Sequence, residues 1–510
     1  MIAKYICDLC KEFNGYNVNK FMRDIMAGLT VASVALPLAL AFGVSSGADA
    51  AAGLITAIAA GLIIGALSGA SFQISGPTGA MSAILIGVSA RYGINGVLLS
   101  GLISGGLLIL MSLLNVGKLV QFIPSPVIAG FTSGIALVIV LGQVDNFFGV
   151  SSRGADLVEK LLSYRALGFI PNLQAVMIGV LAVSVMLIWP PKWPIPGSLV
   201  AIITALVINV AINPSVAAVH EVGDIPRSLI TDNRLSFTNL SIRDLLDAIA
   251  PALSIAALGM IESLLCGLSA GHMKDEKLDA RRELMAQGIG NLLIPLIGGV
   301  PATAAIARTS VAIKAGQQTR LTSVLHSLVL IASMLLLNKV MSRIPLAALS
   351  GVLIVTAWRM NEWPDIHMIF TSRMKHAIFM YLVTLICTVL FDLTIAIAAG
   401  ILVAAISFVI KSAQLHVTTA DSLDGCRVIS LHGALFFGTQ NCIDKIEALS
   451  KDASCITIDL SSAYSADLSA LNALAELCAY LTAHGTGVSI IGAKPELYRE
   501  MNRLGMAKLP

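Results

Sequence analysis

Charged residues are scarce in this chain. Asp, Glu, Lys and Arg make up 12% of the 510 residues, whereas hydrophobic residues make up 56%. So few polar groups cannot cover a soluble globule of this size, and we therefore expect an integral membrane protein. The net charge of +3 is small for the length and gives no indication of a nucleic-acid partner.

A cysteine framework is also absent. The eight cysteines are scattered, several of them within apolar runs, so no disulfide pattern is readable and we expect reduced thiols. Cys7 and Cys10 form a CxxC pair, but no second Cys pair or His pair completes a zinc site. No nucleophile with a base beside it lies in an apolar run, so we expect neither an enzyme nor a bound cofactor.

The charges that are present are spread unevenly along the chain. Residues 25–411 are poor in charge and rich in apolar runs, and the charge density rises after Asp421. We therefore expect a cytoplasmic N-terminal segment over residues 1–24, a transmembrane transport domain over 25–411 and a cytoplasmic domain over 412–510. The N-terminal segment carries charges and lacks the long apolar run of a removable signal peptide.

Apolar runs of membrane-spanning length fall into two sets that we expect to be inverted repeats. A short, interrupted segment stands between the second and third members of each set, so the two halves match in order. About seven crossings in each half would invert the second half relative to the first. The first set lies near residues 25–44, 51–69, 96–115, 125–142, 170–189 and 197–213, and the second near 248–267, 284–297, 319–337, 344–358, 376–391 and 393–410.

The two short segments, 76–93 and 299–316, carry most of the functional information. Each has Pro and then Thr near its start and is too interrupted to cross a bilayer as a regular helix, which needs roughly 20 apolar residues. We expect Pro77 in the first turn of a half-helix, with small residues around Thr78 and Thr303 leaving the backbone amides accessible. Two such N-termini facing one another would bind an anion. The alternative is that both segments serve close helix packing.

Two ionisable residues lie well inside apolar runs. A charge at Arg308, within the second short segment, is costly in hydrocarbon, so we expect it to face the anion path; an interhelical ion pair or snorkelling to the cytoplasm is the alternative. Glu262 lies within the run ALGMIESLL, where a carboxylate can bind H⁺ or Na⁺, although a fixed structural pair is also open. For His326, polar packing is the favoured interpretation.

Basic residues in the short loops indicate the orientation. Lys20, Arg23, Arg281, Arg282 and Arg373 lie in candidate cytoplasmic loops, which carry an excess of Lys and Arg in membrane proteins. This places the N-terminus inside, and an even number of crossings places the C-terminus inside as well. We expect a multi-pass protein of a bacterial-type inner (plasma) membrane.

The residues after position 411 alternate between strand-like and helix-like patterns. This order predicts a small sheet covered by helices, without a catalytic constellation. The strand-like runs are 427–438, 454–460 and 488–493, and the helix-like runs are 467–484 and one that begins near Pro495.

At these residues the chain resembles the SulP family of anion permeases, called solute carrier family 26 in animals. Its first, third, eighth and tenth spans are similar to DIMAGLTVASVALPLALAFG (24–43), ISGPTGAMS (74–82), ALGMIESLL (257–265) and GGVPATAAIARTSV (298–311). Its C-terminal STAS domain is similar to the part that contains IDLSSAYSADLSALNAL (458–474). The resemblance covers nearly the whole chain.

The resemblance implies an α-helical polytopic fold and an assembly. It implies 14 spans in a 7+7 inverted repeat, with a core and a gate like those of uracil permeases, followed by a small α/β STAS domain. It also implies a homodimer with cytoplasmic STAS domains and elevator-like alternating access.

The resemblance and the half-helix openings together predict the site. Glu262 matches an acidic residue of the eighth span that is linked to H⁺ or Na⁺ coupling in the family, so a Na⁺ near it is possible and no other metal is expected. The predicted substrate-binding residues are Leu38, Phe42, Thr78, Gly79, Ala80, Thr303, Ala304, Ala305, Ala307 and Arg308.

Three pocket positions depart from the family pattern. Ala307 stands where animal members often carry Ser, Ala304 where many bacterial members carry Gly, and Leu38 where animal relatives carry Gln. The pocket is therefore more apolar and depends on backbone amides, so substrate selectivity cannot be transferred. In the STAS pattern, Ser469 occupies the position that is phosphorylated in anti-sigma-factor antagonists.

We expect a secondary active transporter of a small anion such as sulfate, bicarbonate, a dicarboxylate or chloride, coupled to H⁺ or Na⁺. The expected partners are the anion, membrane lipid, a second copy of the chain and a cytoplasmic protein at the STAS domain. One alternative is a nucleobase permease of the same architecture. The other is a STAS-linked anion sensor in which transport is incidental.

Overall fold

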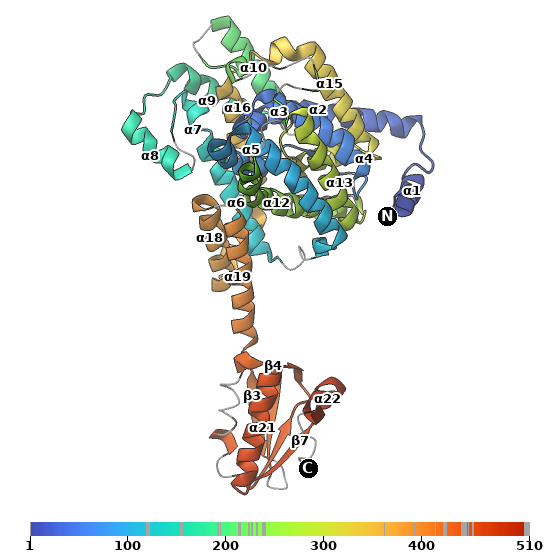
Figure 1. The fold of residues 1–510 in the computed structure, drawn as a ribbon, viewed down its shortest axis with the longest axis vertical. Coiled ribbons are helices and arrows are strands. Elements are labelled where there is room, and N and C mark those ends of the chain that lie inside the picture. Colours follow the sequence, from blue (N-terminus) through green and yellow to red (C-terminus); the bar gives the residue numbers. More distant parts are fainter. Residues whose placement is uncertain are drawn as a thin grey trace. The chain divides into compact units, whose positions relative to one another are not determined.

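The structure is a computed structural model that describes residues 2–118, 123–153, 157–190, 193, 195–212, 216–222, 225, 228–230, 233–236, 241–361, 363–391, 393–413, 415–421, 426–439, 446, 448–450 and 453–503. The chain divides into two compact units, Met1–Gly400 and Ile401–Pro510, each with its own hydrophobic core (Figure 1).

The first unit is a bundle of helices. A π-helix, η1 (Ala60–Ile64), joins α3 to α4, and a 3-10 turn, η3 (Ile294–Ile297), follows α13. Its helices are α1 (Ile2–Glu12), α2 (Val18–Ser45), α3 (Ala50–Ala59), α4 (Gly65–Leu67), α5 (Gly79–Leu113), α6 (Ser125–Gly142), α7 (Val144–Phe148), α8 (Leu157–Leu167), α9 (Leu173–Ile188), α10 (Gly197–Ile212), α11 (Val219–Val222), α12 (Ile242–Lys274), α13 (Ala280–Leu293), α14 (Ile306–Lys314), α15 (Leu321–Met341), α16 (Leu346–Met360), α17 (Trp363–Thr371), α18 (Lys375–Leu390) and the first part of α19 (Leu393–Ser412).

Membrane-spanning length is clear for part of this bundle. Among the described residues, six helical stretches are long and apolar enough to cross a membrane, and other apolar helices such as α9, α10, α16 and α18 are shorter. The count of 14 spans therefore stays a prediction. The six long stretches are Val18–Ser45, Ala50–Leu67, Gly79–Leu113, Ser125–Phe148, Ile242–Gly271 and Leu321–Met341.

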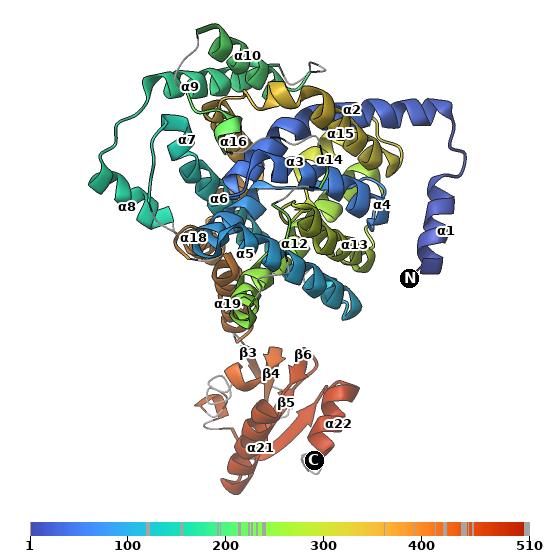
Figure 2. The same cartoon turned by 45° about the horizontal axis from the view of Figure 1, so that its top comes forward.

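Helices from the two halves of the chain pack against one another. In one group, α5 contacts α12 and α13, and α2 contacts α3 and α15; in a second group, α6 contacts α18, and α16 contacts α6, α9 and α10 (Figure 2). Small residues allow this packing. A side chain at Gly130 of α6, for example, would meet the backbone of Tyr381 in α18. The mixed groups agree with two halves that interlock.

Two very short strands interrupt the matched segments. Strand β1 (Ser75–Gly76) pairs antiparallel with β2 (Thr303–Ala304), so that Gly76 lies opposite Thr303. The half-helix after β1 begins at Gly79 and ends in a kink at Gly93, where φ is 68°. Pro77 lies before this helix, so its predicted place in the first turn is wrong. Thr78 takes the N-cap instead, because its hydroxyl can accept a hydrogen bond from the Met81 amide at 3.3 Å.

The N-terminal helix α1 docks on the ends of several helices of this unit through ion pairs. Glu12 pairs with Arg320, with 2.8 Å between Oε2 and Nη2, and both side chains are less than one-tenth exposed. Asp8 pairs with Arg282 at 2.7 Å. Both guanidinium groups stack over the Tyr5 ring, at 5.4 and 5.5 Å from its centroid. The contacts join α1 to the starts of α13 and α15.

A buried carboxylate continues this contact network. Asp24 in α2 accepts hydrogen bonds from the hydroxyls of Tyr16, Thr319 and Thr322, at 2.8, 2.6 and 2.8 Å. Burial, together with the Asp24 carboxylate, raises the pKa of Tyr16 to about 12. These hydrogen bonds hold the start of α2 against the start of α15.

The second unit contains a five-stranded sheet with two described helices in addition to the end of α19. The strands follow the order β3-β4-β5-β7, with β6 also paired to β4; β3 is antiparallel to β4 and the other pairs are parallel. The elements are β3 (His416–Asp421), β4 (Arg427–Leu435), η4 (Phe437–Thr439), β5 (Cys455–Asp459), β6 (Ala463–Ala466), α21 (Leu468–Ala483), β7 (Gly487–Ile491) and α22 (Pro495–Arg503).

A disulfide between Cys426 and Cys455 corrects the expectation that all thiols are reduced. Arg427 pairs with Ile456 in the parallel ladder of β4 and β5, so the residues just before them are also neighbours, with Cα atoms 4.6 Å apart. This neighbourhood depends on strand register, which the spacing of the two cysteines along the chain does not indicate.

Candidate functional site

The centre of the candidate site is one carboxylate held by two threonines. The Thr78 hydroxyl donates to Glu262 Oε2 at 3.0 Å, and the Thr303 hydroxyl donates to the same oxygen at 3.1 Å. Thr78 is the N-cap of α5, Thr303 lies in β2, and Glu262 is half-buried on α12. Three segments that are distant in sequence therefore meet at one oxygen atom.

Buried hydrogen bonds fix both non-helical segments in place. The Thr309 hydroxyl accepts from the Ile74 amide at 3.0 Å, and the Ser263 hydroxyl accepts from the Ala304 amide at 3.2 Å. Asn291 accepts from the Ala302 amide and donates to its carbonyl, at 2.7 and 2.9 Å. Because backbone groups within a membrane must find partners inside the protein, these side chains make the interrupted segments possible.

Arg308 lies in the first turns of α14 and is 1% exposed. Its Nη2 donates to the Pro77 carbonyl at 2.6 Å, which links α14 to the segment before α5. Its Nη1 is buried and has no hydrogen-bond partner in the part of the chain that the structure describes. A buried unpartnered donor on a guanidinium requires an explanation, and an anionic ligand would supply the missing acceptor.

Gly76 allows the guanidinium to approach so closely. A Cβ at this position would overlap Arg308 Nη1, and the guanidinium carbon would lie 3.1 Å away. The absence of a side chain at Gly76 thus gives the guanidinium its space, and no left-handed backbone angle is involved.

The other predicted residues surround this centre to different degrees. Leu38 and Phe42 on α2 are each 6% exposed, and Gly79 and Ala80 begin α5. Ala304 is fully buried in β2, and Ala305 is the N-cap of α14. Ala307 is exposed although Arg308 beside it is buried.

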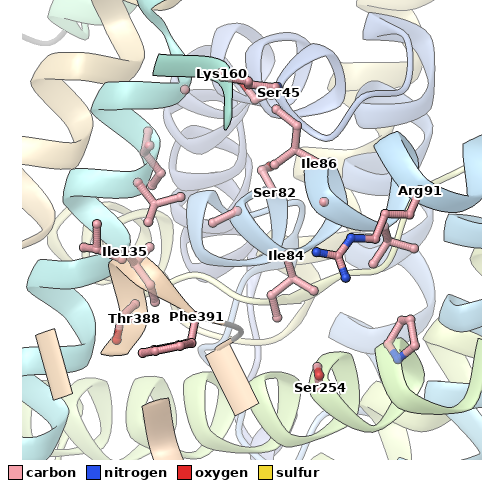
Figure 3. Close-up of a pocket in the computed structure, with 18 of the residues that line it drawn as sticks. Ser45, Ser82, Ile84, Ile86, Arg91, Ile135, Lys160, Ser254, Thr388 and Phe391 are labelled. Atoms are coloured by element: carbon pink, nitrogen blue, oxygen red, sulfur yellow. The ribbon is translucent and has the colours of Figure 1, made fainter. Parts of the chain in front are cut away.

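A cavity of about 490 Å³ lies beside this centre, among α2, α5, α6, α8, α12 and α18 (Figure 3). Phe42 belongs both to its lining and to the predicted site. Hydroxyl groups of Ser45, Ser82, Ser254 and Thr388 also belong to residues that line it. We refer to this space as the α5–α6 cavity.

Sequence reasoning did not identify the pairing of β1 with β2, nor the bracing residues Ser263, Asn291 and Thr309. Short strands of two residues leave no periodic pattern, and small polar residues in helices are common. The available signal was that Asn291, together with Gln287, interrupts the apolar run 284–297, where a polar amide needs a partner.

The C-terminal unit presents a smaller polar cluster at the end of β5. Asp459 Oδ1 accepts from the Ser461 hydroxyl and amide, at 2.5 and 2.9 Å, and these hydrogen bonds lower the pKa of Asp459. Asp467 is the N-cap of α21, and Ser469 lies in the first turn of that helix. Among the described residues no group of three or more His, Cys, Asp and Glu side chains could hold a metal ion.

Comparison with known proteins gives matches along nearly the whole chain. Residues 21–384 match the sulfate permease family and residues 418–510 match the STAS domain. The "Putative sulfate transporter YvdB" of Bacillus subtilis is 33% identical over 97% of this chain and 96% of its own length. The bicarbonate transporter BicA of a Picosynechococcus strain is 29% identical over 95% of this chain and 91% of its own length.

Solved structures give the same picture. The transmembrane domain of a cyanobacterial BicA matches with a TM-score of 0.67 and 27% identity, over 75% of this chain and 98% of that one. The murine anion transporter Slc26a9 in an inward-facing state matches with a TM-score of 0.83 and 16% identity, over 96% of this chain and 88% of that one. The second likeness shows a shared fold.

Proposed function

Because this chain belongs to the sulfate permease family and carries a STAS domain, we propose that it is a secondary active transporter of a small anion, coupled to H⁺ or Na⁺. The names of its relatives make sulfate and bicarbonate the first candidates. Dicarboxylate and chloride are the other anions we propose. The observation that carries the proposal is the meeting of Thr78, Thr303 and Glu262 at one oxygen, close to the buried Arg308.

The anion would bind where the two half-helices begin. The N-termini of α5 and α14 supply backbone N–H groups and partial positive charge, a preference for anions worth up to about 2 kcal/mol in partly buried geometries. Arg308 adds a full charge and the unpartnered Nη1 donor. Gly79 and Ala80 begin α5 with small side chains that leave room for an anion at its first amides. The amides of Ala304 and Ala305 already donate to the Ser263 hydroxyl and the Ile74 carbonyl, so at the second half-helix the anion would meet the first turn of α14 instead.

Glu262 would couple the anion to a cation. Its carboxylate and a bound anion would repel one another in a space of low dielectric, so each would disfavour the other. A proton or a Na⁺ at the carboxylate removes this repulsion, and the two threonine hydroxyls are oxygen ligands suitable for Na⁺. Anion and cation would therefore bind together, which is the thermodynamic requirement of symport.

Transport would proceed by movement of a core against a gate. The group of α2, α3, α5, α12, α13 and α15 carries the site and would be the core, whereas α6, α9, α10, α16 and α18 would be the gate. With both termini cytoplasmic in an inner membrane, the α5–α6 cavity would open to the outside. A homodimer would hold the gates fixed while the cores move.

The test is uptake into proteoliposomes that contain the purified full-length chain. Labelled sulfate, bicarbonate, succinate, chloride and uracil would be offered in parallel, with and without an imposed pH or Na⁺ gradient. We expect saturable uptake of at least one anion that the gradient accelerates. Uptake of uracil alone would instead establish a nucleobase permease. Binding of an anion without any flux would favour the sensor.

Two variants separate binding from coupling. Arg308→Ala should raise the anion concentration for half-maximal uptake at least about tenfold, because a charge-assisted hydrogen bond contributes about 1.5–3 kcal/mol. Glu262→Gln should keep uptake but abolish its acceleration by the gradient. Unchanged anion affinity in the first variant, or equal acceleration of the second variant and the parent, would contradict the assigned roles.

A further inference from the structure

We infer that the α5–α6 cavity is a second anion-binding space, in front of the central site, and that Arg91 is its charge-recognising residue. The inference rests on the proposed function for the direction of transport. It concerns a different set of side chains from the Thr78, Thr303 and Glu262 cluster.

The charges on the cavity lining have one sign. Among the described lining residues, Arg91 and Lys160 carry positive charge and none carries negative charge. Arg91 comes from the end of the α5 half-helix and Lys160 from α8. Figure 3 shows the Arg91 guanidinium reaching into the cavity between the α5 side chains and Ser254 of α12. A cleft lined by one sign of charge raises the local concentration of counter-ions and their rate of entry.

The size of the cavity is suited to a hydrated anion. Serine and threonine side chains of the lining come from α2, α5, α12 and α18. The hydroxyls of Ser82, Ser254 and Thr388 donate to backbone carbonyls, so they can hold water through their oxygen atoms and leave recognition of the anion to the basic side chains. The volume of about 490 Å³ exceeds that of a small inorganic anion, so an anion would enter together with water.

An apolar contact separates this cavity from the central site. A Cβ at Gly79 would lie 2.5 Å from Ile139 Cδ1 and 3.2 Å from Phe42 Cε1. Phe42 on α2 and Ile139 on α6 are 6% and 7% exposed, and both line the cavity. They pack over the N-terminal end of α5, between the proposed core and gate. The side chains of Phe42 and Ile139 would therefore separate an anion bound near Arg91 from the central site until the core moves.

Charge-selective labelling tests the inference without requiring transport. Ser254→Cys places a thiol on the cavity lining, and its reaction rates with an anionic sulfonatoethyl and a cationic trimethylammonioethyl methanethiosulfonate give a ratio that reports the local potential. The parent chain, treated identically, gives the background from native thiols. We expect the anionic reagent to be favoured at the introduced thiol, and Arg91→Gln to lower the rate ratio about tenfold at low ionic strength.

Three companion variants sharpen the result. Arg91→Lys should keep most of the ratio, and Lys160→Gln should lower it further when combined with Arg91→Gln. Arg243→Gln, an exposed basic residue of α12 that does not line the cavity, should leave the ratio unchanged. A ratio of anionic to cationic rates no higher than that of a free thiol in solution, or equal ratios in Arg91→Gln and Arg243→Gln, would overturn the inference.

Uptake kinetics give the matching functional readout. Arg91→Gln should raise KM about tenfold with kcat within twofold, and the difference should shrink when an impermeant gluconate salt screens the cavity. A fall in kcat at constant KM would contradict the assignment. If the labelling ratio behaves as expected but no anion is transported, the proposed transport function fails while the anion-attracting cavity stands.

Discussion

At the scale of single residues, the site depends on two hydroxyl groups that share one carboxylate oxygen. Thr303 is fully buried, and its hydroxyl donates to Glu262 Oε2 and contacts the Ala304 carbonyl. Thr78 donates to the same oxygen from the N-cap of α5. The matched Pro and Thr of the two segments were therefore a correct guide to residues that meet, although the binding role of these residues is still a proposal.

Thr303→Val should weaken coupled uptake. The substitution keeps the shape and removes one of the two hydroxyl donors to Glu262, a hydrogen bond to a charged group worth about 1.5–3 kcal/mol. We expect the cation concentration for half-maximal stimulation of uptake to change at least about tenfold. Thr356→Val is the control, since that hydroxyl donates within its own helix, to the Val352 carbonyl. Equal cation dependence in both variants would count against the role of Thr303.

Gly76→Ala should displace the Arg308 guanidinium. The added methyl carbon would overlap Nη1, so the arginine must move away from the Pro77 carbonyl or from the anion. We expect anion affinity to fall at least tenfold, about 1.4 kcal/mol or more, in the proteoliposome assay. Gly106→Ala on α5 is the matched control, because a Cβ there meets nothing within 4 Å. Wild-type affinity in Gly76→Ala would show that the two groups do not compete for space.

At the scale of elements, two ion pairs that differ in burial hold α1 against the first unit. Glu12 and Arg320 form a buried ion pair, whereas Lys4 and Asp279 form a pair in which the lysine is 68% exposed. Removing one partner of a buried pair costs about 3–5 kcal/mol, and an exposed pair contributes about 0–1 kcal/mol. The two pairs join the same helix to the same unit, so they can be compared directly.

We expect Glu12→Ala to lower the melting temperature of the detergent-solubilised protein by several degrees, and Lys4→Ala to leave it within about one degree. Intrinsic tryptophan fluorescence during heating would follow both transitions. Similar melting temperatures for the two variants would mean that α1 is not held by the Glu12 pair. A loss of uptake in Glu12→Ala at a temperature where the protein is folded would link α1 to the movement of the core.

Sequence patterns located the long elements well and the short ones poorly. The apolar run 125–142 coincides with α6, and 197–213 nearly coincides with α10, because apolar length is set by the bilayer. Strand β3 was missed since its residues, HVTTAD, carry no apolar run, and it is identified only by its ladder with β4. Helix α17 begins with Trp-Pro and is too short to give a clear period.

The candidate site was less predictable than the elements. Arg308 and Glu262 could be singled out because charge inside an apolar run is rare. Their partners could not, since the Pro77 carbonyl and the two threonine hydroxyls come from segments brought together by the β1 and β2 ladder. Ala307 was expected to line the pocket on family position; its side chain is exposed, and its place in the anion pocket stays a prediction. The resemblance to the SulP family is confirmed.

At the scale of the whole molecule, the proposed orientation places the end of the α5 half-helix outside the cell and the C-terminal unit in the cytoplasm. Tyr92, at the end of the α5 half-helix, is 43% exposed, and Tyr480, in α21 of the C-terminal unit, is 46% exposed. Cysteines at these positions should therefore react at similar rates with a thiol reagent that can reach them. The side of the membrane from which each cysteine is labelled then determines the topology of the chain.

In intact cells, a membrane-impermeant maleimide should label Tyr92→Cys and not Tyr480→Cys. In inverted membrane vesicles, Tyr480→Cys should be labelled, each signal being corrected for the native thiols of the parent. Labelling of both positions from one side would contradict an odd number of spans between an outward-facing Tyr92 and a cytoplasmic C-terminal unit. The same preparation tests whether the Cys426–Cys455 disulfide is present in the cell, since disulfides are rare in cytoplasmic domains.

The pairing of Ser75 with Ala304 and of Gly76 with Thr303 has a consequence for any attempt to produce the two halves of the chain separately. Each half of the chain contributes one of the two strands, and the proposed anion site would form only when both strands are present. Either half of the chain produced alone should therefore neither bind nor transport the anion. Two halves that are produced separately should regain activity only if they assemble and restore the pairing of β1 with β2.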